Sequence, residues 1–281
     1  MTTLAVNRPR TRPRWVSEPP QVPPDGTTAR ARSAAQRVVD DWLAMRRASA
    51  VGDARLRVLE AGCGGTTQLD LPAGAELTGL DISAAQLERH PRLVRRVLGD
   101  VQAHDFEGET FDIVICWNVL EHVARPDAGL RTLLAATAPG GLTIVAVPNL
   151  WSVKGLVTRW TPFRVHYWYY RYVHRDPSVG TTATLQFPTV LHPAVGPRRL
   201  RAQAESLGAT VRLAHCYVGS VQEALYTRSR LARVAFAVVG AFSRLVTGGR
   251  YDLALSDAIL ILQRPHSGRA ARPSSLQLEN R

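Results

Sequence analysis

The chain has 281 residues, of which 45% are hydrophobic, so it can bury a large core and is not disordered as a whole. Its three cysteines, Cys63, Cys116 and Cys216, lie far apart, which excludes a disulfide scaffold and a Cys-x-x-Cys zinc site. No apolar run approaches the length of a membrane span, and the N-terminus lacks the apolar stretch of a secretory signal. We therefore expect a cytoplasmic protein, either soluble or peripheral at the inner surface of the membrane.

The net charge of +12 is distributed unevenly along the chain. Residues 1–47 carry +5, residues 48–150 carry −5, residues 151–263 carry +9 and residues 264–281 carry +3. Lys154 is the only lysine, and a bias toward arginine of this kind is what a GC-rich coding sequence would give. The charge therefore does not by itself indicate a nucleic-acid-binding protein, and no nucleic-acid partner is expected.

The predicted elements lie between two tails. Residues 1–26 are rich in proline and arginine and read as a disordered basic arm, either a solvated tail or a tether to nucleic acid or lipid headgroups; residues 264–281 form a second disordered tail. In between, apolar runs alternate with helical patterns, which predicts an α/β doubly wound fold with a parallel sheet. Strands are expected over 57–61, 76–81, 94–98, 111–117, 142–147, 210–217 and 258–263, and helices over 29–49, 83–89, 127–138, 197–207 and 221–246.

The first predicted strand runs into a glycine-rich turn in the segment RVLEAGCGGTT, residues 57–67. Glycines let the backbone take positive φ and approach a ligand closely, although an ordinary tight turn would also explain them. A dinucleotide-binding loop would need a third glycine at Thr67, and Glu60 would repel a pyrophosphate, so a dehydrogenase is disfavoured. The carboxylate of Glu60 instead suits a ligand that carries a cationic amine.

Acidic residues also stand at the ends of the next two predicted strands. Asp81 ends the second strand, where a carboxylate can accept hydrogen bonds from both hydroxyls of a ribose. Asp100 follows the third strand and could meet an adenine amine, and the fourth strand ends at Trp117. Strand ends of this kind, in this order, form a specific pattern.

With this pattern the chain resembles the class I S-adenosylmethionine-dependent methyltransferases, well over residues 50–150 and more weakly to residue 263. The family motif is acid-x-Gly-x-Gly-x-Gly, and here Thr66 occupies the third glycine position, with a glycine one place earlier. The resemblance implies a Rossmann-like doubly wound seven-stranded sheet in a three-layer sandwich, mostly parallel with an antiparallel last strand, plus an inserted helical lid. It also implies S-adenosylmethionine as cofactor: the methionine part held by Glu60, Gly62 and Gly64, the ribose and adenine bound by Asp81 and Ile82, the adenine flanked by Asp100 and Val101, and the sulfonium beside the backbone of Trp117.

The segment Asn118–His122 is similar to one in quinone-biosynthesis O-methyltransferases, some of which bind a divalent metal there through two Glu and a His. Asn118 replaces the first Glu, leaving Glu121 and His122, so no metal is predicted. His122 could act as a base near the methyl acceptor, or it could make a structural hydrogen bond at a helix start.

An insertion is expected over about 151–196, and its residues 160–175 are the most aromatic stretch of the chain. It could form a lid that excludes water, with His166 and Tyr167 contacting the acceptor, or a locally packed helix. A platform for single-stranded nucleic acid is disfavoured by the strand-end motifs. Asn149, after the fifth strand, could orient an acceptor or form a plain turn.

The long helix expected over 221–246 places Arg233 and Arg244 on one face, while the rest of its surface is largely apolar. Its segment 228–246 could pack on the insertion, lie in a membrane interface with its arginines toward anionic lipid, or form a homodimer contact.

Two classes of function remain open. The first is an enzyme, with a methyltransferase domain over 27–263, that methylates a hydroxyl, or less readily a nitrogen or carbon, of a small or lipid-linked molecule. The basic half, residues 151–263, suits an anionic acceptor. The second is a methyltransferase-like cofactor-binding or scaffold protein without turnover, which the altered third glycine would favour.

Overall fold

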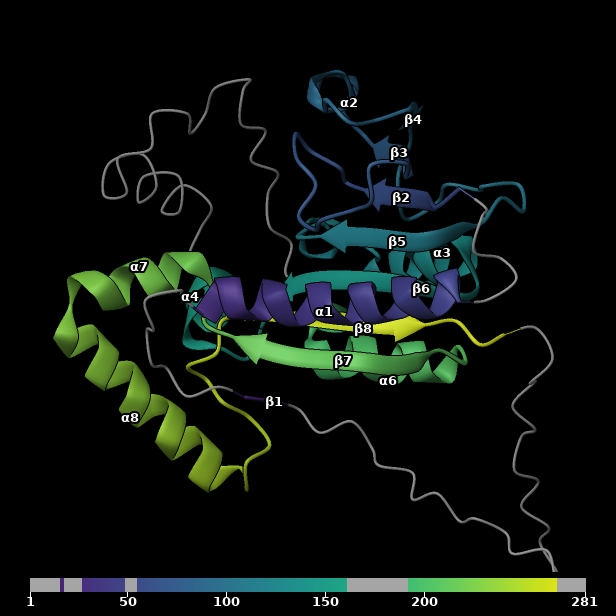
Figure 1. The fold of residues 1–281 in the computed structure, drawn as a ribbon. Helices are drawn as coiled ribbons and strands as arrows, with labels where there is room; N and C mark the ends of the chain where they lie inside the picture. The colour runs from purple at the N-terminus through teal and green to yellow at the C-terminus, as the bar shows by residue number, and fades with distance from the viewer. Residues whose placement is uncertain (1–15, 18–26, 49–54, 161–191, 267–281) are drawn as a thin grey trace, which may run out of the picture.

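One sheet organises the protein (Figure 1). The computed structural model describes residues 16–17, 27–48, 55–160 and 192–266, and within them eight strands pair in the order β1-β7-β8-β6-β5-β2-β3-β4. The strands are β1 (Val16–Ser17), β2 (Arg57–Ala61), β3 (Glu76–Asp81), β4 (Arg95–Leu98), β5 (Phe111–Trp117), β6 (Thr137–Pro148), β7 (Thr210–Tyr217) and β8 (Asp257–Gln263).

The topology confirms the predicted doubly wound sheet. Strand β8 is antiparallel to both β6 and β7, and the other pairings are parallel, so the predicted antiparallel last strand is confirmed. The seven predicted strands correspond to β2–β8. The eighth, β1, comes from the predicted basic arm: Val16 and Ser17 pair with His215 and Cys216 of β7. A two-residue strand is too short to show any alternation in the sequence.

Helices cover both faces of the sheet, which gives the predicted three layers. Figure 1 shows α1 in front of the sheet and α3 and α6 behind it. The helices are α1 (Thr27–Arg47), α2 (Ala84–Arg89), α3 (Pro126–Ala136), α4 (Val153–Trp160), α6 (Pro197–Ser206), α7 (Ser220–Arg228) and α8 (Arg230–Val246), with short 3-10 turns at Leu120–His122 and Pro193–Val195.

The core consists of two apolar clusters, one on each face of the sheet. Because successive side chains of a strand point to opposite faces, Ile113 and Ile115 of β5 join the cluster under α1, while Val114 and Cys116 join the cluster under α3 and α6. All four side chains are completely buried. Burial on both faces explains why β5 reads as a continuous apolar run rather than as an alternating one.

The long helix expected over 221–246 is wrong as one element, because the chain breaks into α7 and α8 at Ser229. Ser229 has extended backbone angles, φ −140° and ψ 109°, and its side chain accepts a hydrogen bond from the Ala232 N–H at 3.1 Å. A serine in this position satisfies a free N–H group at the start of a helix, and it can therefore begin a new helix within an apolar pattern.

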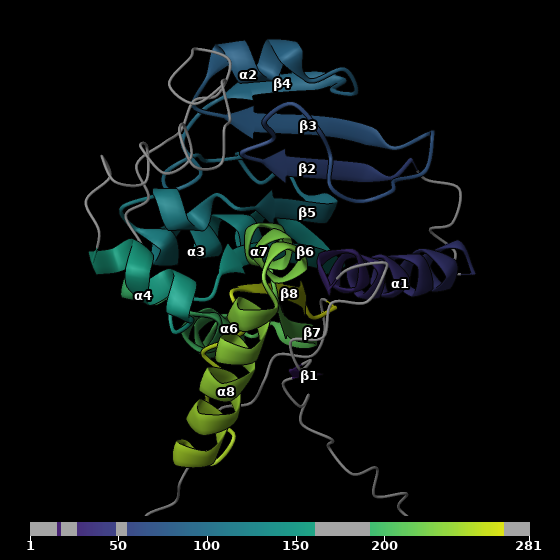
Figure 2. The ribbon, with the colours of Figure 1, turned by 90° about the vertical axis from the view of Figure 1, so that its left-hand side faces the viewer.

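The carboxyl ends of the parallel strands lie at one edge of the sheet. Figures 1 and 2 show α4, α7 and α8 beyond this edge, with α8 extending away from the sheet. Within the described ranges, no helix combines the length and the apolar character that crossing a bilayer requires. Open α/β sheets bind ligands at the carboxyl edge, so this edge holds the candidate site.

Candidate active site

The glycine-rich loop after β2 is shaped by two different constraints. Gly62 has φ +67°, and a Cβ atom on it would lie 2.2 Å from Cγ2 of Val119, in the segment after β5. Gly64 has φ +50°, and a Cβ atom there would meet no atom of the described residues within 4 Å. The first glycine therefore allows close packing inside the protein. The second gives the loop its turn where it borders open space.

Glu60 is buried and contacts this loop from the interior of the protein. Its Oε2 accepts a hydrogen bond from the Thr67 hydroxyl at 2.8 Å and lies 3.6 Å from Nε2 of His90. Burial raises the pKa of Glu60 to about 7 and lowers the pKa of His90, so burial favours the neutral form of both side chains. Glu60 thus links the motif strand to Thr67, the last residue of the glycine-rich segment, and sequence reasoning did not foresee these two partners.

Asp81 lies at the end of β3 beside the same loop. Its Oδ2 is 3.4 Å from the Gly64 N–H, and its Oδ1 accepts the Ser83 N–H at 2.9 Å. Register explains the proximity, since Ala61 pairs with Leu80 across the parallel strands. Asp81 is 8% exposed, whereas the neighbouring Ile82 is 59% exposed at the surface.

The other predicted cofactor residues flank these positions. Asp100 is exposed, and its carboxylate accepts hydrogen bonds from the backbone and side chain of Gln102. Val101 is buried in the core cluster under α3. Trp117 is partly buried at the end of β5, next to Asn118, which has φ +55°. The backbone thus turns sharply where the sulfonium is expected.

The residues present fit the expected cofactor. Gly64 borders open space next to Asp81, and among the described residues each Asp81 oxygen accepts one backbone hydrogen bond. A carboxylate has about four lone-pair positions, so acceptor capacity remains for the two ribose hydroxyls. The loop, Asp81 and Asp100 lie at the carboxyl ends of three neighbouring parallel strands, β2, β3 and β4.

A second group of titratable side chains lies further along the carboxyl edge. Glu121, in the turn after β5, is 5% exposed, and its Oε2 has no hydrogen-bond partner among the described residues. The pKa of Glu121 is raised to about 8, mainly by burial; the negative charge of Asp257 also raises it, while a backbone hydrogen bond and the positive charge of Lys154 lower it. Nε2 of His122 lies 4.0 Å from Oε1 of Glu121.

Lys154 and Asp257 are functional candidates that sequence reasoning missed. The Lys154 ammonium lies 3.4 Å from Asp257, which also accepts the Ser256 hydroxyl at 2.6 Å. Asp257 begins β8, and because β8 is antiparallel, its first residue reaches the carboxyl edge of its neighbours. The one signal in the sequence was that Lys154 is the only lysine of the chain.

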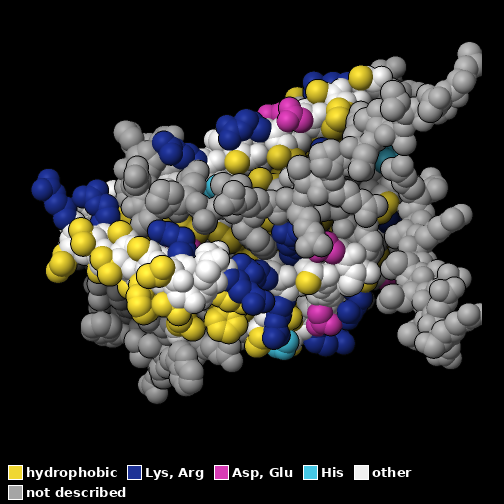
Figure 3. All heavy atoms as spheres, turned by 90° about the horizontal axis from the view of Figure 1, so that it is seen from below, with side chains coloured by type: hydrophobic (Ala, Val, Ile, Leu, Met, Phe, Trp, Pro, Cys, Tyr) yellow, Lys and Arg dark blue, Asp and Glu magenta, His cyan; other side chains and the backbone are white. Residues whose placement is uncertain are grey.

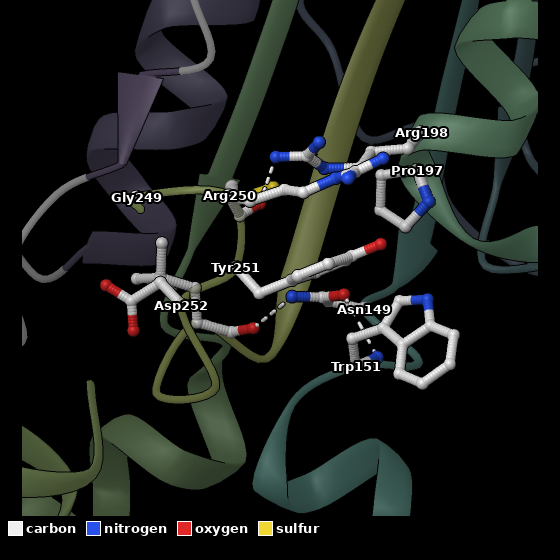
Figure 4. A pocket seen from close by; sticks show the side chains of 10 residues that line it. Asn149, Trp151, Pro197, Arg198, Gly249, Arg250, Tyr251 and Asp252 are labelled. Atoms are coloured by element: carbon white, nitrogen blue, oxygen red, sulfur yellow. Dashed lines mark hydrogen bonds between the residues drawn. The ribbon is translucent and has the colours of Figure 1, made fainter. Parts of the chain in front are cut away.

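A pocket near the end of β6 combines aromatic and basic side chains (Figure 4). The Tyr251 ring lies between the Arg198 guanidinium, 4.8 Å from its centroid, and the Trp151 indole, whose centroid is 5.8 Å away. The side-chain amide of Asn149 connects two lining segments of the pocket: it donates to the Leu255 carbonyl at 2.7 Å and accepts the backbone N–H of Trp151 at 3.2 Å. These contacts favour the turn interpretation of Asn149 over orientation of an acceptor.

The remaining predicted acceptor contacts, His166 and Tyr167, lie outside the described residues, as does most of the insertion over 151–196. In the part of the chain that the structure describes, no three His, Cys, Asp or Glu side chains gather as metal ligands.

Comparison with known proteins points to one family. A model of a methyltransferase domain matches residues 31–176. The ubiquinone biosynthesis O-methyltransferase of Chelativorans sp. (strain BNC1) is 36% identical over 129 residues, which cover 40% of this chain and 51% of that protein. The same enzyme of Rhodopseudomonas palustris (strain BisB18) is 35% identical over 130 residues, with the same shares covered. The chain thus spans about half the length of the curated relatives it matches.

Solved structures give more distant likenesses. The [4+2]-cyclase SpnF has 18% identity and a TM-score of 0.46, with 83% of each chain covered. The CurJ carbon methyltransferase has 15% identity and a TM-score of 0.48, with 85% of this chain and 55% of that chain covered.

Proposed function

The chain belongs to the methyltransferase-domain family, and on that premise we propose that it transfers the methyl group of S-adenosylmethionine to a hydroxyl oxygen of a small-molecule acceptor. The observation that carries the proposal is Asp81, held beside the Gly64 backbone at the carboxyl edge of the sheet. When bound, the cofactor supplies an electrophilic methyl group on a sulfonium.

The residues at the cofactor end of the site hold the cofactor in position and take no part in the reaction. Asp81 accepts hydrogen bonds from the ribose hydroxyls, Ile82 and Val101 flank the adenine, and Asp100 meets its amine. Gly62 and Gly64 let the loop approach the methionine part, and Glu60 holds the shape of that loop through Thr67. A cationic amine near Glu60 would favour its ionised form and lower its pKa from about 7.

The acceptor end must remove a proton when the acceptor is a hydroxyl. The pKa of Glu121, about 8, lies near neutral pH, and a general base works best when its pKa is near the working pH. Lys154 and Asp257 are positioning residues that set the charge around it. His122, His166 and Tyr167 stay predicted acceptor contacts, and His122 is the alternative base.

Hydroxyl oxygen is the favoured acceptor atom for two reasons. The curated relatives that the chain matches are named O-methyltransferases, and a buried carboxyl with a raised pKa suits the deprotonation of a hydroxyl. The arginines and aromatic rings around Tyr251 suit an acceptor with an anionic or ring-shaped group, or one that is linked to a lipid. A lipid-linked acceptor would place the protein at the inner face of the cytoplasmic membrane, a location that cell fractionation checks.

Titration calorimetry with S-adenosylmethionine tests the cofactor assignment. We expect Asp81→Ala to weaken binding roughly 100-fold, because it removes charge-assisted hydrogen bonds to the ribose. Asp41→Ala, at an exposed position of α1, is the matched control and should bind like the wild type. Equal binding by Asp81→Ala and the wild type, or no binding by the wild type, would contradict the assignment.

Turnover is tested separately from binding. Incubation of the protein with cell extract and a methyl donor labelled with deuterium should give a labelled product whose mass identifies the acceptor. A protein that binds the donor but leaves no labelled product would instead be the cofactor-binding scaffold that the altered third glycine allows.

A further inference from the structure

The outward face of α8 is apolar, which is the reverse of an ordinary surface helix. Six large side chains on this face are between 58% and 81% exposed: Leu231, Val234, Val238, Phe242, Leu245 and Val246. The polar side of the helix instead faces the protein. Ser243 is buried, and Arg244 pairs with Asp252, whose side chain is 5% exposed.

These inward contacts fix the orientation of α8. The Ser243 hydroxyl accepts the Leu253 N–H at 3.1 Å, and Phe236 packs edge-on against Tyr226 with ring centroids 5.4 Å apart. A rotation that buried the apolar face would break the Arg244–Asp252 pair. The contacts of α8 with the rest of the protein therefore determine that its apolar face is exposed.

Positive charge accompanies this face. Between Glu223 and Asp252 the chain has five arginines and no acidic residue. Arg228, the last residue of α7, and Arg230, the first residue of α8, are exposed, and Arg250 is exposed just beyond the end of α8. Figure 3 shows hydrophobic side chains gathered over α8 with basic side chains at both ends of the band.

We propose that the exposed face of α8 docks onto a membrane that contains anionic phospholipid. The apolar side chains would enter the boundary between headgroups and acyl chains, and Arg228, Arg230 and Arg250 would meet lipid phosphates. A second copy of the chain fits less well, because a 17-residue helix is only about 26 Å long and one face of it offers less than the roughly 800 Å² per partner of a stable interface. Pairing two copies through this face would also bring arginines of both copies together. The proposal does not depend on methyl transfer.

Flotation of the full-length protein with vesicles tests the proposal, using phosphatidylcholine alone and phosphatidylcholine mixed with phosphatidylglycerol. The wild type should float with the mixed vesicles at least roughly tenfold more than with neutral ones. Phe242→Gln combined with Leu245→Gln should reduce flotation roughly tenfold or more, because two apolar anchors are lost. The matched control, Met45→Gln with Leu207→Gln, changes two exposed apolar side chains on α1 and next to α6 and should float like the wild type.

A charge variant gives an independent measurement that does not disturb the apolar face. Arg228→Gln with Arg230→Gln should lower flotation with the mixed vesicles roughly tenfold, while Arg37→Gln with Arg47→Gln on α1 should not. Circular dichroism confirms that each variant is folded. The proposal is overturned if the wild type does not float, or if the α8 variants float as well as the controls. It is also overturned if size-exclusion chromatography shows that the wild type is a dimer, and that Phe242→Gln with Leu245→Gln separates this dimer but leaves flotation unchanged.

Discussion

Glu121 and Glu60 are both buried carboxyls at the carboxyl edge of the sheet, but their surroundings differ. Glu60 has the Thr67 hydroxyl as a donor, whereas Oε2 of Glu121 has no partner within the described residues. The pKa values are raised to about 7 and about 8, in both cases mainly through burial. The buried Oε2 of Glu121 thus has its full acceptor capacity unused among the described residues.

Replacing Glu121 by Gln tests its role as the base. If the ionised carboxylate removes the proton, kcat rises with pH through about 8, and Glu121→Gln lowers kcat by roughly 10² to 10⁴ and abolishes this rise. The measurement is the pH profile of methyl transfer to the identified acceptor. If His122→Gln removes the rise and Glu121→Gln keeps it, His122 is the base.

Unfolding measurements give a control that does not require the acceptor. A carboxyl whose pKa is raised from 4.5 to about 8 by folding contributes stability that is complete below pH 4.5 and is lost as the pH rises through about 8. We expect the wild type to lose on the order of a few kcal/mol relative to Glu121→Gln over this range. A constant difference between the two proteins would mean that the Glu121 carboxyl does not titrate in this way.

At the scale of elements, the break between α7 and α8 decides where the apolar face points. Without it, one long helix would continue along a single axis from the body of the protein. With it, α8 starts anew at Ser229, turns its polar side to Asp252 and exposes its apolar side. One hydroxyl at the junction therefore supports the arrangement of the whole outer helix.

We expect Ser229→Ala to destabilise the start of α8 by about 1 kcal/mol, because the Ala232 N–H loses its acceptor. Hydrogen exchange should become faster at the amides of residues 231–233. Ser229→Asp keeps an acceptor at this position and should restore slow exchange. If Ser229→Ala slows the exchange and raises the helix content, the two helices prefer to join.

At the scale of the whole molecule, the acidic residues of the predicted cofactor site and the arginine-containing segment around α8 lie at different parts of the carboxyl edge. Glu60 lies near the end of β2, Asp81 ends β3 and Asp100 follows β4, where the cofactor is proposed to bind. Helix α8 and the loop after it, whose sequence includes Arg230 and Arg250, lie beyond the opposite part of the sheet (Figures 1 and 2). The molecule thus separates the proposed site for a cationic cofactor from the proposed surface for an anionic membrane.

Salt should therefore affect membrane docking and cofactor binding differently. Raising NaCl from about 0.05 M to about 0.5 M should reduce flotation with anionic vesicles roughly tenfold, because exposed charges are screened. Binding of S-adenosylmethionine should change less than about threefold, because its affinity depends on short hydrogen bonds to Asp81 and to the loop. Calorimetry and flotation at both salt concentrations measure this, and an equal loss of both would show that the two sites are not electrostatically distinct.

The sequence by itself determined strands β2–β8, their order along the chain and the residues at their carboxyl ends. Strands that are buried on both faces must be apolar runs, and the positive φ angles at Gly62 and Gly64 favour glycine. Both features can therefore be recognised in the amino-acid sequence. Asp81 was identified for the same reason, because its position at a strand end fixes what it can reach.

Only the tertiary structure decided which distant side chains meet. Lys154 and Asp257 are about a hundred residues apart in the chain, and the antiparallel pairing of β8 with β6 brings them together. The same holds for the outward face of α8, since apolar residues in a sequence predict burial. The Arg244–Asp252 pair and the break at Ser229 turn that face away from the core. Contacts of this kind depend on packing between elements, which no local pattern encodes.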